Sequence, residues 1–223
     1  MTSARAVFTV FTMSDQRERI LHEACELYLE GGLDGFSMRK LARSVGVTAP
    51  ALYRHYDSKE HVLMDVVREA YREFTGYLYR GLEGRTPEER LQRAGEGYLE
   101  FALRHPRWYR MIFTAAEHLG LEELPDDVEM QGFAVHQFWV DRLRECMDAG
   151  LLVSADPVEV GLTMWAHSHG LITLYHNGHL KMDEEHFVAA CSASWRRILS
   201  GLATDHYVRA LDAREEALAA IES

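Results

Sequence analysis

The sequence predicts an all-α fold in which a small N-terminal three-helix domain precedes a larger helical domain. Ala, Leu, Glu and Arg are frequent in the 223 residues, prolines number only five, and no run of alternating β-branched residues predicts a strand. Charge also divides the chain. Residues 1–60 hold eight Lys/Arg and eight Asp/Glu, whereas residues 61–223 hold 16 and 27 and so carry the whole net charge of −11. A neutral first part and an acidic second part indicate regions with different partners.

Residues 1–14 are expected to form a poorly ordered tail, because Met13 offers a second plausible start. The first helix is expected from about residue 15 to residue 30, where two glycines follow and end it. Its apolar residues recur at helical spacing and would brace the helices that follow: Ile20, Leu21, Ala24, Cys25, Leu27 and Tyr28.

Residues 36–59 predict two short helices that cross around a tight turn. Ser37 is a good N-cap for the first helix, and Gly46 allows the left-handed residue that ends it. Thr48 is the N-cap of the second helix, with Pro50 in its first turn, where a missing N–H is harmless. Leu52 would point inward as the anchor of that helix. This spacing predicts a helix-turn-helix within a domain of residues 15–60.

Positive charge is concentrated on this segment. Residues 37–59 contain five Lys/Arg and one acid, Asp57, which gives a local net charge of +4. A cationic helix that also carries an aromatic residue fits the major groove of DNA, and the flanking cations can neutralise phosphates. The alternative is a solvated basic face on an ordinary helical hairpin. The agreement of small-residue, glycine and apolar spacing favours the DNA-binding interpretation.

Several runs of residues in this segment match the pattern of a known family. They are the run from Gly35 to Ala42, then Val45-Gly46-Val47, then Leu52 to Tyr56 with Ser58-Lys59. On these residues the segment resembles the DNA-binding domain of the tetracycline-repressor (TetR) family of bacterial transcriptional regulators. The resemblance covers about a quarter of the chain. It implies contacts with the DNA backbone, the major groove or a phosphate from these residues: Ser37, Met38, Arg39, Thr48, Ala49, Pro50, Ala51, Tyr53, Arg54, His55 and Lys59.

Residues 61–223 are expected to form the second domain. A long helix should begin at Lys59 and end near Gly81, linking the two domains. Thr86-Pro87 with Glu89 is a strong helix start, and His105-Pro106 should end that helix. Residues 120–127 are expected to form a loop. The other helices are expected over about residues 106–119, 128–148, 156–176, 184–202 and 204–219.

Trp165, His167 and Gly170 lie in a segment that resembles a tryptophan–histidine–glycine signature of one C-terminal class of the family. Thr163, Ala166, Gly170 and Thr173 form a small-residue stripe that permits close helix packing. The resemblance implies that the last two long helices pair with a second copy in a four-helix bundle. Packing within one subunit is the open alternative. A homodimer is favoured because one short recognition helix seldom reads enough bases alone.

Large adaptable side chains gather in the helices after residue 59. Most would form ordinary core, and a subset would line an apolar cavity for a small ligand. Tyr98, His136 and His169 are the polar candidates within that subset. The full set of candidate ligand-binding residues is Tyr71, Phe74, Tyr98, Phe101, Trp108, Met111, Phe133, His136, Trp139, Trp165 and His169.

Histidines also suggest a metal site. His167 and His169 are two positions apart on one helix, so they cannot hold one ion together. His176 and His179 would have usable spacing if the helix continued past Asn177. Hydrogen-bonded core or interface histidines are the commoner case. No metal or other cofactor is therefore assigned.

The N-terminal apolar run, residues 6–11, is too short for a membrane span or a signal sequence. Cys25, Cys146 and Cys191 are odd in number and far apart, which favours a reducing cytoplasm over a disulfide framework.

Together these observations and the resemblance predict a homodimeric repressor that binds a palindromic operator in double-stranded DNA. A small, largely apolar ligand would release it. One alternative is a DNA-binding regulator that senses a metal. Another is a helical enzyme. This alternative is disfavoured because the sequence contains no nucleophile elbow, phosphate loop or secure metal triad.

Overall fold

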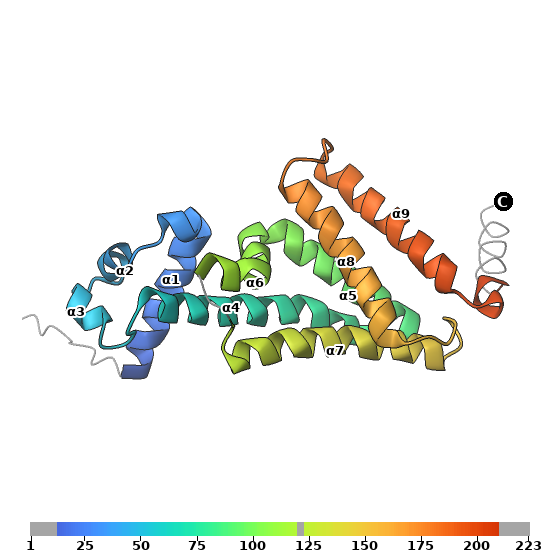
Figure 1. Cartoon of the computed structure of the whole chain (residues 1–223), viewed down its shortest axis with the longest axis horizontal. Helices are drawn as coiled ribbons and strands as arrows, with labels where there is room; N and C mark the ends of the chain where they lie inside the picture. Colours follow the sequence, from blue (N-terminus) through green and yellow to red (C-terminus); the bar gives the residue numbers. More distant parts are fainter. Residues whose placement is uncertain (1–12, 120–122, 210–223) are drawn as a thin grey trace, which may run out of the picture. The chain divides into compact units, whose positions relative to one another are not determined.

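The computed structural model describes residues 13–119 and 123–209 (Figure 1). These residues are helical throughout apart from turns, with one isolated bridge pair between Leu152 and Ala203. The predicted all-α fold is therefore confirmed. Of the expected tail, residues 1–12 lie outside the described part of the chain, and α1 begins at Met13.

The chain forms two compact units. The first comprises Met1–Tyr71 and Arg107–Leu124, and the second comprises Arg72–Pro106 and Pro125–Ser223. The continuous helix α4 (Lys59–Tyr79) supplies residues to both units. The helix expected to link the two parts of the chain is therefore the one that passes from one unit to the other.

The first unit contains α1 (Met13–Gly35), α2 (Met38–Val45), α3 (Ala49–Leu52), the start of α4 and most of α6 (Pro106–Leu119). The glycines expected to end the first helix do interrupt it. Gly32 has a φ of 61°, a left-handed conformation that breaks the helical path before Gly35.

The core of the first unit holds the helix-turn-helix against α1 and α4. Ile20, Leu41 and Leu52 are fully buried. α6 also packs on α1, since the rings of Tyr28 and Trp108 are 6.0 Å apart and the Tyr28 hydroxyl donates to the carbonyl of Arg107 over 3.1 Å. The two short helices thus rest on a rigid apolar base.

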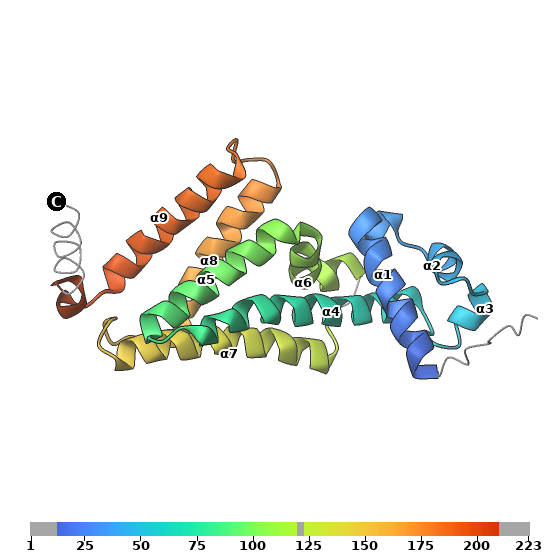
Figure 2. The same cartoon turned by 180° about the vertical axis from the view of Figure 1, so that it is seen from behind.

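The second unit contains the end of α4, a 3-10 turn η1 (Arg80–Glu83), α5 (Pro87–Arg104), α7 (Asp126–Asp148), α8 (Pro157–His176) and α9 (Glu184–Leu202). α8 and α9 run side by side in both views (Figures 1 and 2). The chain turns at η1 because Gly81 lies against α5: a Cβ placed there would be 2.9 Å from the carbonyl oxygen of Arg90.

Side-chain caps start three helices of this unit near the residues where the sequence predicts those helices to begin. Thr86, Asp156 and Asp183 each accept a hydrogen bond from an amide of the first turn of α5, α8 and α9. Thr204 likewise accepts a bond from the amide of Tyr207 over 3.2 Å and starts a further helical segment. That segment is described only as far as Arg209.

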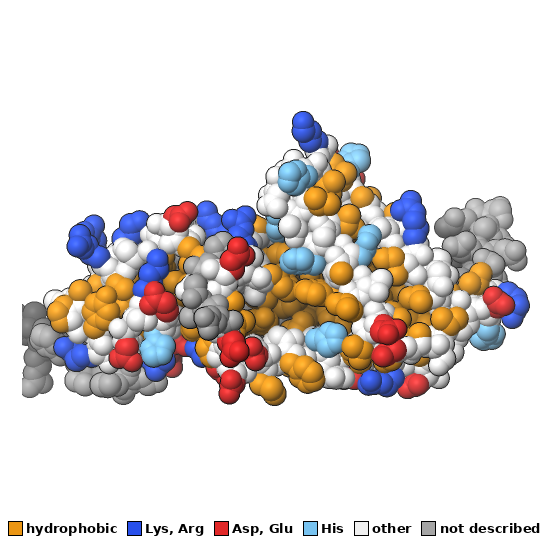
Figure 3. Space-filling model, in the orientation of Figure 1, with side chains coloured by type: hydrophobic (Ala, Val, Ile, Leu, Met, Phe, Trp, Pro, Cys, Tyr) orange, Lys and Arg blue, Asp and Glu red, His pale blue; other side chains and the backbone are white. Residues whose placement is uncertain are grey.

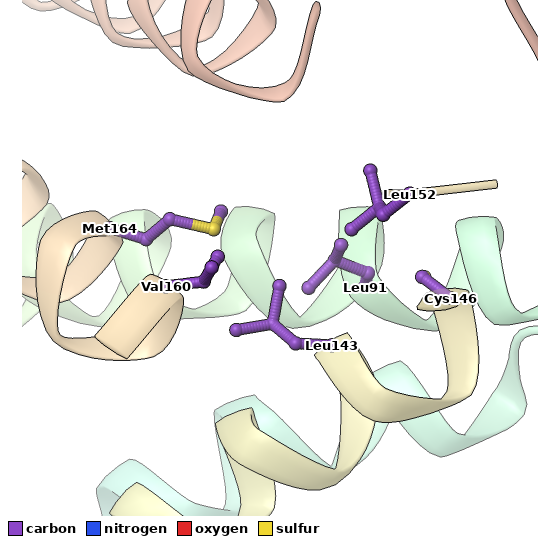
Figure 4. Packing of buried hydrophobic residues seen from close by; sticks show 6 residues of the cluster. All are labelled: Leu91, Leu143, Cys146, Leu152, Val160 and Met164. Atoms are coloured by element: carbon purple, nitrogen blue, oxygen red, sulfur yellow. The ribbon is translucent and has the colours of Figure 1, made fainter. Parts of the chain in front are cut away.

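Part of the core of the second unit is built from α5, α7, α8 and the turn before α8. Figure 4 shows its buried side chains converging from these elements: Leu91, Leu143, Cys146, Leu152, Val160 and Met164. Trp195, Ile198, Leu199 and Leu202 of α9 cover them from one side. The described helices include none that is both long and apolar enough to cross a membrane.

Candidate nucleic-acid interface and ligand cavity

Local hydrogen bonds fix the two ends of α2. The side chain of Ser37 accepts from the amide of Lys40 over 3.3 Å, as expected of an N-cap. At the other end Gly46 is left-handed, with φ 77° and ψ 31°, and the amide of Val47 donates to the carbonyl of Ala42 over 2.9 Å. This is the glycine-ended turn that the sequence predicts between the two short helices.

The second short helix, α3, presents one face inward and one outward. Thr48 caps it, because its hydroxyl accepts from the amide of Ala51 over 3.4 Å. Leu52 is fully buried, whereas Ala49, Pro50 and Tyr53 on other sides are exposed. Figure 3 shows hydrophobic side chains at the surface over α3, flanked by Lys and Arg from the neighbouring helices.

The basic residues of the helix-turn-helix are accessible. Arg39, Arg43 and Arg54 are exposed, and within the described residues their side chains form no ion pair or hydrogen bond. Lys59 is half-buried, with its amino group 5.8 Å from the centre of the Phe36 ring. The three arginines can therefore turn toward an anion without breaking an internal contact, whereas Lys59 would leave the Phe36 ring.

The other residues predicted to contact DNA differ in how far their side chains are exposed. Ala51 and His55 are half-buried on the recognition helix and its continuing turn, and Ser37 is half-buried as the cap. Met38 is only 8% exposed and belongs to the core. Its backbone amide at the start of α2 is therefore the group that could contact a phosphate.

A small cavity lies between α5, α7, α8 and α9 of the second unit. It has about 20 Å³ of free space, much less than a drug-sized ligand needs. Its lining is mostly aromatic and apolar, with hydroxyl groups from Tyr98 and Ser168: Tyr98, Trp139, Leu143, Gly161, Met164, Trp165, Ser168 and Trp195.

Three of the predicted ligand-binding residues, Tyr98, Trp139 and Trp165, meet in this cavity. Phe74 and Phe101 are buried just beside it, with the rings of Phe74 and Tyr98 5.6 Å apart. His136 and His169 are half-buried, and burial lowers the pKa of His169. Phe133 is 59% exposed at the surface of α7. Tyr71, Trp108 and Met111 are buried in the first unit.

Trp195 closes the cavity from α9 and was not predicted from the sequence. Its indole N–H donates to the Ser168 hydroxyl over 2.7 Å, and that hydroxyl donates to the carbonyl of Met164 over 2.8 Å. The ring lies across the backbone of Gly95 on α5, where a Cβ would come within 2.7 Å of it. A glycine inside a helix was the available signal, because it indicates a group in close approach.

Two other features of the second unit are weaker candidates for a ligand site. A groove of about 490 Å³ beside η1 and α5 is open and lined by acidic and basic side chains, two of which, Arg80 and Glu100, form a 2.9 Å ion pair. No group of three or more metal-binding side chains comes together anywhere in the described ranges. The His167 side chain bonds the Ser194 hydroxyl of α9 at 2.8 Å.

The first unit contains two capped helices separated by a glycine turn, and the second of these helices is exposed beside accessible cations. These features define a helix-turn-helix DNA-binding protein. Residues 20–66 match the family model of bacterial regulatory proteins, tetR family. Residues 91–202, half of the chain, match the model of the tetracyclin repressor-like C-terminal domain. The chain therefore belongs to the TetR family of transcriptional regulators, as the resemblance implies. Its assignment to the tryptophan–histidine–glycine class stays a prediction.

Individual relatives agree with this assignment. The transcriptional repressor KstR2 of Mycolicibacterium smegmatis is 29% identical over 135 residues, which are 59% of this chain and 65% of that repressor. A solved protein of unknown function from Rhodococcus sp. RHA1 has a TM-score of 0.75 and 24% identity, and the match covers 90% of this chain and 100% of that protein. AibR, solved with isovaleryl coenzyme A and operator DNA, has a TM-score of 0.60 and 17% identity, and the match covers 78% of this chain and 95% of AibR.

Proposed function

We propose that the chain is a homodimeric transcriptional repressor that binds a palindromic operator and is released from it by a small, largely apolar effector. The observation that carries the proposal is the helix-turn-helix of the first unit. Its caps and its left-handed Gly46 set a recognition helix whose outer face is free. A regulator rather than an enzyme is also what the family membership supports. The proposal implies a cytoplasmic site of action, where bacterial DNA lies.

The recognition helix supplies different kinds of contact along its exposed face. Ala49, Pro50 and Ala51 offer small apolar groups that suit the methyl group of thymine. Tyr53, Arg54 and His55 follow on the next turn and carry the hydrogen-bonding groups for base edges or phosphates.

Contacts to the DNA backbone would come from three helix starts. Ser37 and the amides of Met38 and Arg39 open α2, where the positive end of the helix favours a phosphate. Thr48 opens α3 in the same way, and Lys59 opens α4. These contacts would hold the protein in register, while α3 reads the sequence.

A second copy would pack on α8 and α9. Hydrophobic side chains of these helices are exposed, among them Leu162, which is 54% exposed, and Trp165, which is 42% exposed. Thr163 and Ala166 of the small-residue stripe are exposed as well, so this part of the stripe is not used for packing within the subunit. Exposed apolar side chains on paired helices support an interface there, and two copies would read two half-sites.

The effector would bind at the cavity lined by Trp139, Trp165 and Trp195. Its lining is mostly aromatic and aliphatic, and the Ser168 hydroxyl is already engaged, so the lining favours an apolar ligand body. The complex of AibR with isovaleryl coenzyme A and operator DNA supports a fold that serves both partners. An effector larger than the cavity would favour a conformation with a wider cavity, and α4, which supplies residues to both units, would carry that change to the DNA-binding unit.

The experiment that tests the DNA-binding proposal uses Arg54→Ala. An operator is first selected from random duplexes with the full chain, and its affinity is measured by fluorescence anisotropy across a salt series. We expect Arg54→Ala to weaken operator binding by about 1–3 kcal/mol, because an exposed cation facing the DNA is lost. Arg144→Ala is the matched control, since Arg144 is exposed on α7 and, among the residues that the structure describes, pairs with Asp141 alone. Equal affinities for both variants and the unchanged chain would count against the proposal.

A further inference from the structure

One carboxylate in the first unit joins three elements of the helix-turn-helix support. Asp65 of α4 accepts hydrogen bonds from the Tyr56 hydroxyl at 2.9 Å and from Arg17 of α1 at 3.0 Å, both on Oδ2. Its other oxygen, Oδ1, accepts from Arg68 at 2.8 Å. The Asp65 side chain is 15% exposed. Neither Asp65 nor Tyr56 is among the functional residues predicted from the sequence.

Tyr56 is the residue through which Asp65 acts on the recognition helix. It ends the helical turn that continues α3, and its amide donates to the carbonyl of Leu52 over 3.2 Å. The Tyr56 side chain is 2% exposed, and the Arg17 guanidinium lies 5.1 Å from its ring centre. Apolar packing of Leu52 and Tyr56 holds α3 against the core, whereas the directional bond to Asp65 limits rotation of α3 on that core.

The charges favour a strong bond. Burial alone raises the pKa of Asp65, but hydrogen bonds from Arg17 and Tyr56 outweigh burial and leave this pKa below its usual value. Burial, with the bond to Asp65, raises the pKa of Tyr56 to about 12. Near neutral pH the phenol therefore donates to a carboxylate, and such charge-assisted bonds are roughly twice as strong as neutral ones.

We infer that Asp65 is a positioning residue for DNA recognition, which acts through Tyr56 to fix the orientation in which α3 presents Tyr53 and Arg54. This inference rests on the proposed function. Recognition of a particular DNA sequence depends on the orientation of the side chains that contact the bases, whereas non-specific DNA binding depends on charge near the phosphates. Loosening α3 therefore weakens binding to the operator and leaves binding to random DNA unchanged.

Tyr56→Phe isolates the hydrogen bond, because it removes one hydroxyl and keeps the ring. The matched control is Tyr28→Phe, which removes the hydroxyl of another buried tyrosine in the same unit, there bonded to a backbone carbonyl. For the full chain and both variants, anisotropy gives affinities for the selected operator and for a random duplex at the same salt. Stoichiometric titration supplies the active fraction, so that a loss of folded protein is not read as a loss of affinity.

We expect Tyr56→Phe to weaken operator binding at least ~5-fold, the effect of losing about one hydrogen bond, with random-duplex binding unchanged. Tyr28→Phe should change neither affinity per active molecule. Asp65→Asn, which keeps the size of the side chain, should weaken operator binding further. Equal losses on both duplexes, or Tyr56→Phe behaving like Tyr28→Phe, would overturn the inference alone. No preference of the unchanged chain for the selected duplex would instead overturn the proposed function.

Discussion

The helix-turn-helix of the first unit and the ligand cavity of the second are built in opposite ways. In the helix-turn-helix, each feature comes from residues within a few positions: Ser37 bonds Lys40, Gly46 ends the helix that Ser37 starts, and Thr48 bonds Ala51. In the cavity, the lining comes from four helices spread over about a hundred residues. The first arrangement is set by local sequence and the second by packing. Substitutions in the two regions should therefore differ in kind.

The largest expected effect concerns the exposed face of α8 and α9. Leu162→Asp would place a carboxylate in the proposed subunit interface, where burial without a partner costs several kcal/mol, and the two-fold axis would apply that cost twice. Analytical ultracentrifugation should then show a monomer at concentrations where the unchanged chain is a dimer. Leu82→Asp is the control, because Leu82 is 52% exposed on η1, outside α8 and α9. A dimer that survives Leu162→Asp would place the interface elsewhere.

A core substitution should act on the second unit through stability. Leu143 is 1% exposed and lines the cavity, so Leu143→Ala should lower the free energy of unfolding by about 2–5 kcal/mol and widen the cavity. Urea denaturation followed by circular dichroism measures the loss. Leu82→Ala removes the same atoms from an exposed site and should change the unfolding free energy by less than about 0.5 kcal/mol. Similar effects of the two substitutions would contradict the packing around Leu143.

A smaller effect is expected where one local conformation is required. Gly46→Ala would put a Cβ on a residue with a φ of 77°, which should destabilise the helix-turn-helix by about 1 kcal/mol. Gly76→Ala should have the opposite sign, because Gly76 lies within α4 in a helical conformation with open space at its Cβ. Thermal unfolding of both variants gives the comparison. A neutral Gly46→Ala would show that the turn tolerates a different path.

The contrast between the regions also explains what the sequence could predict. Ser37, Thr48 and Thr86 were assignable as caps because a cap is a bond between residues three apart, and all three accept that bond. The cavity was predicted only in part, since Trp195 reaches it through the fold and not through a motif. Phe133 shows the same limit. It follows the fully buried Val128 by five positions, a rotation of about 140° around α7, and so lies on the exposed side.

The network around Asp65 was missed for a related reason. Tyr56, Asp65 and Arg17 lie on three elements, and each alone reads as an ordinary core or surface residue. Their meeting depends on how α1 and α4 cross near the end of α3, which no local pattern encodes. The DNA-contact residues of the exposed face stay predictions, and the selected-operator measurements with Arg54→Ala are the direct test of them.

The aromatic lining of the cavity has a practical consequence for finding the effector. The chain has four tryptophans, and three of them, Trp139, Trp165 and Trp195, face this one cavity. Intrinsic fluorescence of the unlabelled protein is therefore dominated by emitters at the place where the effector is proposed to bind. A molecule that enters and displaces Trp195 from its bond to Ser168 should shift or quench that emission. Candidate compounds can thus be screened optically before any operator is known.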